Sequence, residues 1–252
     1  MSERTYVASG DGYDLFHEGD KAIRIYKSED LKEKCLYAAL THARVETTMV
    51  NSAIMMPIVR EVSRIDGKWA ITLDWIEGKT MFQLMKENPS KLELYVNQLI
   101  DIQTEYHEQY MPLLSKLKDK MSRQIKSLGQ IDEIKKYELL TRLDSMPKHI
   151  KLCHNNFSPK EVVINDDGVF VLDWSNARQG NASADVARTY LLLCLHYPEA
   201  AELYLDKFCQ RSRTSKRYVQ AWLPIVASAQ LIKNKPEEKD LLMRWIDVVD
   251  YE

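Results

Sequence analysis

The sequence predicts an α+β protein in which a small antiparallel sheet with one helix precedes a mainly helical region. Three observations predict this class. Short β-prone runs separated by turn residues fill about the first 80 residues, apolar residues recur at helical spacing after Gly78, and one strand–turn–strand segment, residues 150–173, interrupts the helices. We expect two lobes, residues 1–77 and residues 78–252, joined near Asp74–Lys79, with a cleft between them of the kind that commonly holds ligands.

The first lobe opens with an antiparallel meander. Thr5–Val7 and Tyr13–His17 are short β-prone runs on either side of Ser9-Gly10-Asp11-Gly12. A third run, Ala22–Tyr26, follows a turn at Gly19-Asp20. Because each turn reverses the chain after a few residues, we expect neighbouring runs to pair as hairpins.

One helix and a further hairpin complete the first lobe. The helix is expected over Ser28–Thr48, since Ser28 is a good N-cap and the two acidic residues after it favour the first turn of a helix. Val59–Ser63 and Trp69–Asp74 then bracket a turn at Asp66-Gly67-Lys68 and form the hairpin.

Helical periodicity dominates the second region. Apolar residues mark one buried face at Leu92, Tyr95, Val96, Leu99, Ile102 and Tyr106. Pro147 ends the helical run, after which Ile150–Cys153, Val162–Ile164 and Val169–Leu172 are β-like, with a turn at residues 165–168. Further helices are expected over Pro112–Ser127, Asp132–Ser145, Ala182–Leu195, about Glu199–Gln210, Tyr218–Leu231 and from Pro236 to the C-terminus.

Composition excludes several classes of function. The chain has 252 residues and a formal net charge of −2, so it lacks the basic excess of a protein that binds nucleic acid or an anionic membrane. Four scattered cysteines without a C-x-x-C pair argue against a zinc site or a disulfide framework. The polar N-terminus without an apolar segment, and the lack of a run of roughly 18 apolar residues, predict a soluble cytoplasmic protein without a membrane partner.

The candidate chemistry lies in residues 152–174, which read L-C-H-N-N-F-S-P-K-E-V-V-I-N-D-D-G-V-F-V-L-D-W. His154 opens a loop, Asn156 follows two residues later, and Glu161 follows five residues after that. A hairpin then ends at Asp173. Phosphoryl transfer needs such a layout, because one polar side chain must orient the acceptor hydroxyl while oxygen ligands hold magnesium against the nucleotide phosphates.

This segment resembles the aminoglycoside phosphotransferase and choline kinase family, whose loop H-G-D-x-x-x-x-N is followed by a hairpin that ends in Asp-Trp. The resemblance implies a bilobal protein-kinase-like fold, ATP or another nucleoside triphosphate and Mg²⁺ as cofactors, and a small hydroxylated molecule as substrate. By position, His154 matches the loop histidine, Asn156 the catalytic aspartate and Glu161 the metal-binding asparagine. Asp173 matches the magnesium-binding aspartate, and Asp185 an aspartate that supports the loop from a buried helix.

The resemblance also assigns residues of the first lobe to nucleotide binding. Ala8–Tyr13 would cover the nucleotide, and Arg24 takes the position of a third-strand lysine that contacts phosphates. Arginine keeps the charge of lysine but differs in reach and geometry. The partner of that lysine on the helix is a glutamate, for which Glu33 and Glu46 are both candidates. Asp74–Ile76 would be the hinge, in which Asp74 and Ile76 present backbone groups to the base.

Three departures from the family pattern fall on the active positions Asn156, Glu161 and Arg24. An amide cannot accept the proton of the acceptor hydroxyl, and general-base assistance contributes about 10²–10⁴-fold to a rate. The sequence therefore predicts an aminoglycoside-phosphotransferase-like pseudokinase with impaired catalysis. The alternative is an active phosphotransferase that holds magnesium through Asp173 and Glu161, since carboxylates are good ligands for this metal.

Several questions stay open at the level of the sequence. Asp185 can support the loop or act only as a first-turn acid of its helix, and the two roles can coexist. The phosphoryl acceptor, the choice between ATP and GTP, the oligomeric state and any role in antibiotic resistance have no motif that decides them.

Overall fold

The computed structural model describes residues 3–10 and 12–247. It confirms the predicted α+β class, with an antiparallel sheet in the N-terminal part and helices in the C-terminal part. Contacts divide the chain into two compact units. The N-terminal unit comprises Met1–Glu87 and Pro159–Ala177, and the C-terminal unit comprises Asn88–Ser158 and Arg178–Glu252.

These units differ from the predicted lobes of residues 1–77 and 78–252. The hairpin within residues 159–177 belongs to the N-terminal unit because its two strands pair with short strands from the first 87 residues. The lobe boundary at residues 77 and 78 does not follow from the contacts, and it stays a prediction.

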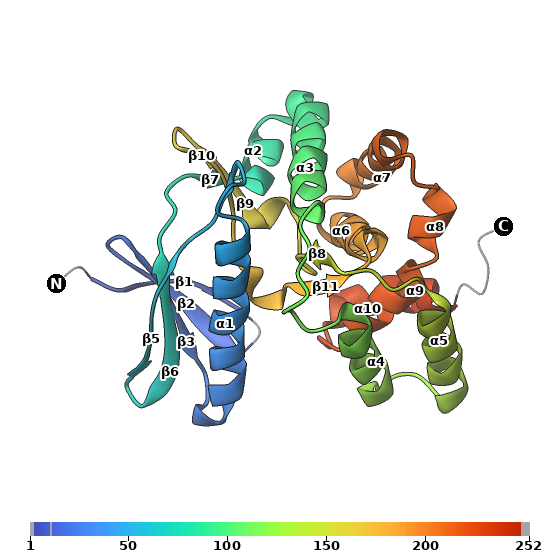
Figure 1. Cartoon of the computed structure of the whole chain (residues 1–252), viewed down its shortest axis with the longest axis horizontal. Helices are drawn as coiled ribbons and strands as arrows, with labels where there is room; N and C mark the ends of the chain where they lie inside the picture. Colours follow the sequence, from blue (N-terminus) through green and yellow to red (C-terminus); the bar gives the residue numbers. More distant parts are fainter. Residues whose placement is uncertain (1–2, 11, 248–252) are drawn as a thin grey trace. The chain divides into compact units, whose positions relative to one another are not determined.

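A five-stranded sheet forms the first layer of the N-terminal unit (Figure 1). Its order is β1-β2-β3-β6-β5, and every neighbouring pair is antiparallel, as the predicted meander and hairpin require. The turn between the last two strands has positive φ at Asp66 (50°) and Gly67 (79°), which suits aspartate and glycine in a tight hairpin. The strands are β1 (Thr5–Ser9), β2 (Tyr13–Glu18), β3 (Lys21–Tyr26), β5 (Val59–Ile65) and β6 (Lys68–Asp74).

Helix α1 (Lys32–Thr48) packs on this sheet and completes the core of the N-terminal unit (Figure 1). The predicted N-cap is present, since the Ser28 hydroxyl accepts a hydrogen bond from the backbone N–H of Asp30 at 3.3 Å. A short 3₁₀ turn, Glu29–Leu31, separates this cap from the α-helix. The buried core side chains that the helix and sheet share are Tyr26, Cys35, Ala38, Ala39, Ile71 and Leu73.

The hairpin that looks isolated in the sequence is the centre of a second sheet, with order β4-β10-β9-β7. Its two outer strands have only two residues each, so they carry no periodicity that the sequence could reveal. Helix α2 (Met81–Glu87) follows the last of them. The strands are β4 (Ile54–Met55), β7 (Lys79–Thr80), β9 (Val162–Asn165) and β10 (Gly168–Val171).

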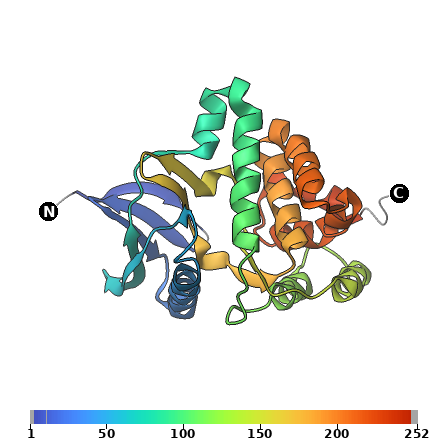
Figure 2. The ribbon, with the colours of Figure 1, turned by 45° about the horizontal axis from the view of Figure 1, so that its top comes forward.

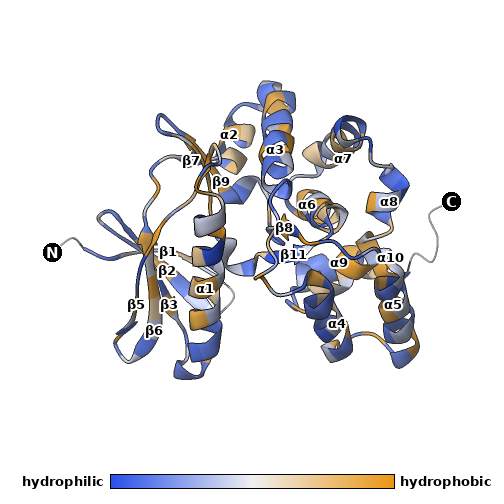
Figure 3. Ribbon diagram, in the orientation of Figure 1, coloured by the Kyte–Doolittle hydropathy of each residue, from blue (hydrophilic) through white to orange (hydrophobic). Residues whose placement is uncertain are grey.

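The C-terminal unit is mainly helical, and α3, α6 and α7 pack together within it (Figure 2). Helix α9 is buried along its whole length and is among the most apolar segments of the unit (Figure 3). A two-stranded antiparallel sheet of β8 and β11 carries the loop that begins at His154. The elements are α3 (Leu92–His107), α4 (Leu117–Ser127), α5 (Glu133–Ser145), β8 (Lys151–Cys153), β11 (Arg178–Gly180), α6 (Ala182–His196), α7 (Pro198–Ser212), α8 (Lys216–Gln220), α9 (Leu223–Leu231) and α10 (Pro236–Asp247).

Two helices predicted for this unit differ in the structure, and the first is α4, which begins at Leu117 and not at Pro112. Tyr218–Leu231 is not continuous but divides into α8 and α9. The physical reason is Pro224, which lacks a backbone donor and lies in the first turn of α9, where that donor is not needed. Across residues 3–10 and 12–247, no helix is both long enough and apolar enough to span a membrane.

Candidate active site

The loop after β8 is fixed in the C-terminal unit by the carboxylate of Asp185. Asp185 accepts hydrogen bonds from the backbone N–H of His154 at 3.2 Å and of Asn155 at 2.6 Å. Asn155 has φ 62°, a left-handed conformation that glycine and asparagine tolerate best. This explains why asparagine can replace the glycine of the H-G-D pattern, and it leaves Asn156 half-buried at the next position.

Asp185 lies in the first turn of α6 and is fully enclosed by polar groups of α3. The Tyr106 hydroxyl donates to it at 2.7 Å, and His107 Nε2 lies 3.1 Å from the same oxygen. Burial alone would raise the pKa of Asp185, but the contacts with His107 and Tyr106 leave that pKa below its ordinary value. A carboxylate that stays ionised can hold both loop amides, so the geometry suits the loop-supporting role predicted for it.

The rest of this loop is also tied down. The hydroxyl of Thr189, one helical turn after Asp185, donates to the carbonyl of Phe157 at 3.1 Å. The Phe157 ring is fully buried and meets the Tyr106 ring edge to face, with 5.3 Å between ring centroids. His154 is also fully buried, which suits an anchoring residue. Asn156 therefore belongs to a loop that is anchored on both sides, and its side chain is an uncharged amide.

In the N-terminal unit, Asp173 follows β10 and carries two strong polar contacts. Its Oδ1 accepts from Arg24 Nη1 at 2.6 Å and from the Ser175 hydroxyl at 2.5 Å. Its backbone is left-handed (φ 48°, ψ 62°), and the next residue, Trp174, is fully buried with its indole N–H donating to Val171. The buried tryptophan anchors the chain on one side and the arginine holds the carboxylate on the other.

Arg24, on β3, is the charged partner of Asp173 and is itself nearly buried, with 9% of its surface exposed. Its guanidinium lies over the ring of Tyr13, 5.2 Å from the ring centroid. Burial opposes the charged form, but Asp173 and Tyr13 outweigh burial and raise the pKa of Arg24, so it is charged at every accessible pH. Among the described residues, the acidic partner of Arg24 is Asp173, and neither Glu33 nor Glu46 pairs with it.

Glu161 stands at the strand end beside Asp173. The backbone N–H of Leu172 donates to the Glu161 carbonyl at 2.7 Å, continuing the register in which Val162 opposes Val171. Leu172 therefore lies opposite Glu161, and Asp173 is the next residue along the chain; both acids have the oxygen atoms that magnesium prefers.

Magnesium is implied by the fold family, but the arrangement around Asp173 does not fit it. A metal ligand must turn its oxygen to the ion, whereas Asp173 Oδ1 already accepts from a permanent cation and a hydroxyl. Within residues 3–10 and 12–247, no group of three or more His, Cys, Asp or Glu side chains is placed to hold a metal ion.

The predicted hinge is partly occupied by structural contacts. The side chain of Asp74 accepts from Arg60 and from the backbone N–H of Ile58, so it fastens β6 to β5. The Trp75 ring stacks on His17 with 4.0 Å between centroids. Ile76, by contrast, makes no hydrogen bond with any described residue, which leaves its backbone N–H and C=O for a ligand.

The predicted nucleotide-covering loop, Ala8–Tyr13, is closed by a tyrosine. The backbone N–H of Gly10 donates to the Tyr13 carbonyl at 2.9 Å, and a Cβ on Gly10 would lie 2.2 Å from the tip of the Tyr13 ring. A larger residue at this position would have to displace the Tyr13 ring. Asp11, also part of this predicted loop, lies outside the described residues.

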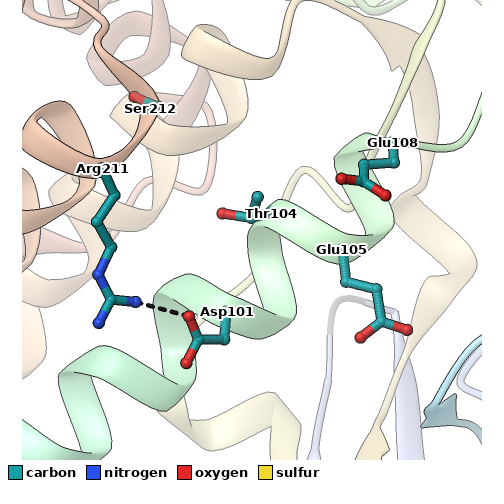
Figure 4. Close-up of a pocket in the computed structure, with 6 residues that line it drawn as sticks. All are labelled: Asp101, Thr104, Glu105, Glu108, Arg211 and Ser212. Atoms are coloured by element: carbon teal, nitrogen blue, oxygen red, sulfur yellow. Dashed lines mark hydrogen bonds and ion pairs between the residues drawn. The ribbon is translucent and has the colours of Figure 1, made fainter.

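A separate pocket of about 430 Å³ lies in the C-terminal unit between α3 and α7 (Figure 4). Arg211 reaches across it to Asp101 at 2.6 Å, while Glu105 and Glu108 add further carboxylates. None of the residues predicted from the sequence lines it. The sequence does not predict this pocket, and it does not predict Ser175 or the partners of Asp185, because these residues match no motif.

The fold is that of the protein-kinase-like class. One unit has a sheet with a helix packed on it, and the other is helical and has a loop whose backbone N–H groups donate to a buried aspartate. The sequence model of the phosphotransferase enzyme family matches residues 60–222, more than half of the chain, and the chain therefore belongs to the phosphotransferase enzyme family. The family resemblance seen in the sequence is thereby confirmed. A search of curated protein sequences found no match.

Solved structures of small-molecule kinases share this fold. A thermostable mutant of aminoglycoside phosphotransferase APH(4)-Ia, in ternary complex with AMP-PNP and hygromycin B, is 14% identical with a TM-score of 0.71, over 97% of this chain and 90% of that one. The GDP complex of an aminoglycoside 2'-phosphotransferase-IIIa mutant is 15% identical with a TM-score of 0.65, over 96% and 91%. Choline kinase from Cryptosporidium parvum Iowa II is 12% identical with a TM-score of 0.59, over 97% and 87%.

Proposed function

We propose that this protein is a kinase-fold nucleotide-binding protein, a pseudokinase, in which phosphoryl transfer to a small hydroxylated molecule is impaired. The observation that carries the proposal is Asn156, an amide at the catalytic-aspartate position of a loop that is otherwise intact. A degraded loop would have lost its supporting contacts as well. Here Asp185 still holds two consecutive backbone N–H groups, so the substitution removes the base while the scaffold stays.

Nucleotide binding is supported by groups that the chain keeps. Ile76 has backbone groups without a partner among the described residues, and Arg24 provides a fixed positive charge for phosphates. Structures of the same fold contain AMP-PNP, GDP or AMP, according to their descriptions. We therefore propose ATP, or another nucleoside triphosphate, as the first ligand of this protein.

The alternative is an active phosphotransferase that uses Asp173 and Glu161. It is favoured by the retention of both carboxylates at neighbouring positions. It is opposed by the ion pair that occupies Asp173 and by the lack of a base at Asn156. The acceptor of such an enzyme would be an alcohol group.

A thermal-shift titration with ATP tests the binding, and ADP formation in the same samples tests the turnover. We expect millimolar ATP to raise the melting temperature of the wild type while ADP formation stays at the level of a sample without protein. Asn156→Asp should bind ATP equally well and form ADP faster than the wild type. Lack of stabilisation by any nucleotide would refute the proposal, as would wild-type turnover that Asp173→Ala abolishes.

A further inference from the structure

The Arg24–Asp173 pair occupies the place where the fold family would put a divalent cation. The pair joins Arg24 on β3 to Asp173, two residues after the end of β10, through a 2.6 Å contact between side chains 149 positions apart in the sequence. Both side chains are nearly enclosed, with 11% and 15% of their surfaces exposed. Such a contact is not a loose surface ion pair, because both groups have given up most of their water.

A second hydrogen bond to Asp173 and an aromatic ring fix the position of the Arg24 guanidinium. Ser175 donates to the same oxygen of Asp173 that Arg24 contacts, and the Tyr13 ring covers the guanidinium. Arg24 is therefore fixed by an acid on one side and an aromatic face on the other. A lysine on its flexible stem could turn from the aspartate to a phosphate, but a planar guanidinium under a ring has fewer ways to leave.

Charge decides what else can bind beside this pair. A divalent ion at Asp173 would lie next to a guanidinium that cannot lose its proton, and it would have to compete for an oxygen that two donors already occupy. An anion meets a pair without net charge and is favoured by the N–H donors that the guanidinium has left. Arg24 has five N–H donors, and among the described residues only Nη1 makes a hydrogen bond, so Nε and Nη2 remain to donate.

We propose that Arg24 replaces the divalent cation, so that the polyphosphate of a nucleotide binds to this protein without metal. This inference rests on the proposed nucleotide binding and adds its charge mechanism. The guanidinium forks onto phosphate oxygens, Asp173 holds the fork in place, and Glu161 does not act as a metal ligand. The ligand class is a nucleoside di- or triphosphate free of magnesium.

Calorimetric titration of the full chain with ATP, in excess EDTA and again in excess MgCl₂, tests the inference. We expect dissociation constants that agree within roughly threefold, since the metal contributes no ligand bond. Arg24→Gln should weaken binding in EDTA by about tenfold or more, the size of a lost charge-assisted hydrogen bond. Arg64→Gln is the matched control, because Arg64 is an exposed arginine of the same sheet and pairs with Glu29. The ATP affinity of this variant should stay at the wild-type value.

A direct metal measurement covers the case in which Arg24→Gln folds poorly. The electron paramagnetic resonance signal of free Mn²⁺ should stay unchanged when the wild-type protein is added, because no site of the protein then binds the ion. Nucleotide binding that requires Mg²⁺, or Mn²⁺ binding at Asp173 in the wild type, would overturn the inference and leave the proposed nucleotide binding intact. Failure to bind ATP in both buffers would overturn the two together.

Discussion

Asp185→Asn should be the most damaging single-atom change in the catalytic-loop region. The Asp185 carboxylate accepts from two consecutive backbone N–H groups and from the Tyr106 hydroxyl, and it lies within reach of His107. An amide of the same shape keeps one acceptor oxygen and replaces the other with a donor. At least one loop N–H must then face an NH₂ group across a buried contact that admits no water.

The magnitude follows from those contacts. Loss of a hydrogen bond to a charged group costs about 1.5–3 kcal/mol, and an unsatisfied buried N–H group costs about 1–3 kcal/mol. The two descriptions overlap for the same atom, so we expect a decrease of about 3 kcal/mol in the free energy of unfolding. For a chain of this size that corresponds to a fall of roughly 6–12 °C in melting temperature.

Equilibrium denaturation in urea measures this change, with Asp101→Asn as the matched control. Asp101 is also an aspartate in an ion pair, with Arg211, but 69% of its side chain is exposed, and its substitution should cost less than about 1 kcal/mol. Equal losses for the two variants would refute the reasoning that Asp185 carries the loop. If Asp185→Asn loses the expected stability but binds ATP as tightly as the wild type, the role of Asp185 is purely structural.

Three further predictions follow from the same geometry. The pKa of Asp185 lies below its ordinary value, so the stability that its carboxylate contributes is present above about pH 4 and is lost as the pH falls through the folded-state pKa. The free energy of unfolding should therefore fall less between about pH 5 and pH 2 in Asp185→Asn than in the wild type. Gly10→Ala should displace the Tyr13 ring and cost about 1 kcal/mol in urea denaturation, whereas Gly129→Ala, which meets nothing within 4 Å, should cost nothing; equal effects would contradict the close approach. The double variant Arg24→Lys, Asn156→Asp should form ADP faster than either single variant, because it restores both a mobile cation and a base. ADP formation no faster than in Asn156→Asp alone would contradict the prediction that Arg24 slows turnover.

The sequence predicts the strands of residues 150–173 well, because turns and hydrogen bonds between near neighbours determine them. His154 and Asn156 lie in the loop after β8, and Glu161 and Asp173 flank the hairpin of β9 and β10. The same is true of the Ser28 cap, whose contact spans two residues. Local hydrogen bonding determines such features, so no knowledge of distant chain is needed.

Pairings between distant segments are less accessible to the sequence. The two-residue strands β4 and β7 are too short for any periodicity, and they are extended only because β9 and β10 offer them hydrogen-bond partners. The partner of Arg24 is the clearest example. A helix glutamate was expected by resemblance, but the fold brings Asp173 to the guanidinium from 149 residues away.

We propose that this protein keeps a kinase-like loop without its catalytic base, and the ratio of two turnover rates tests this. ATP turnover at saturating nucleotide should be about 10²-fold or more faster in Asn156→Asp than in the wild type, while the ATP dissociation constants of the two proteins agree. Equal turnover in the two proteins would contradict the account, as would a wild-type rate within the ordinary range of kinases, about 1–100 per second.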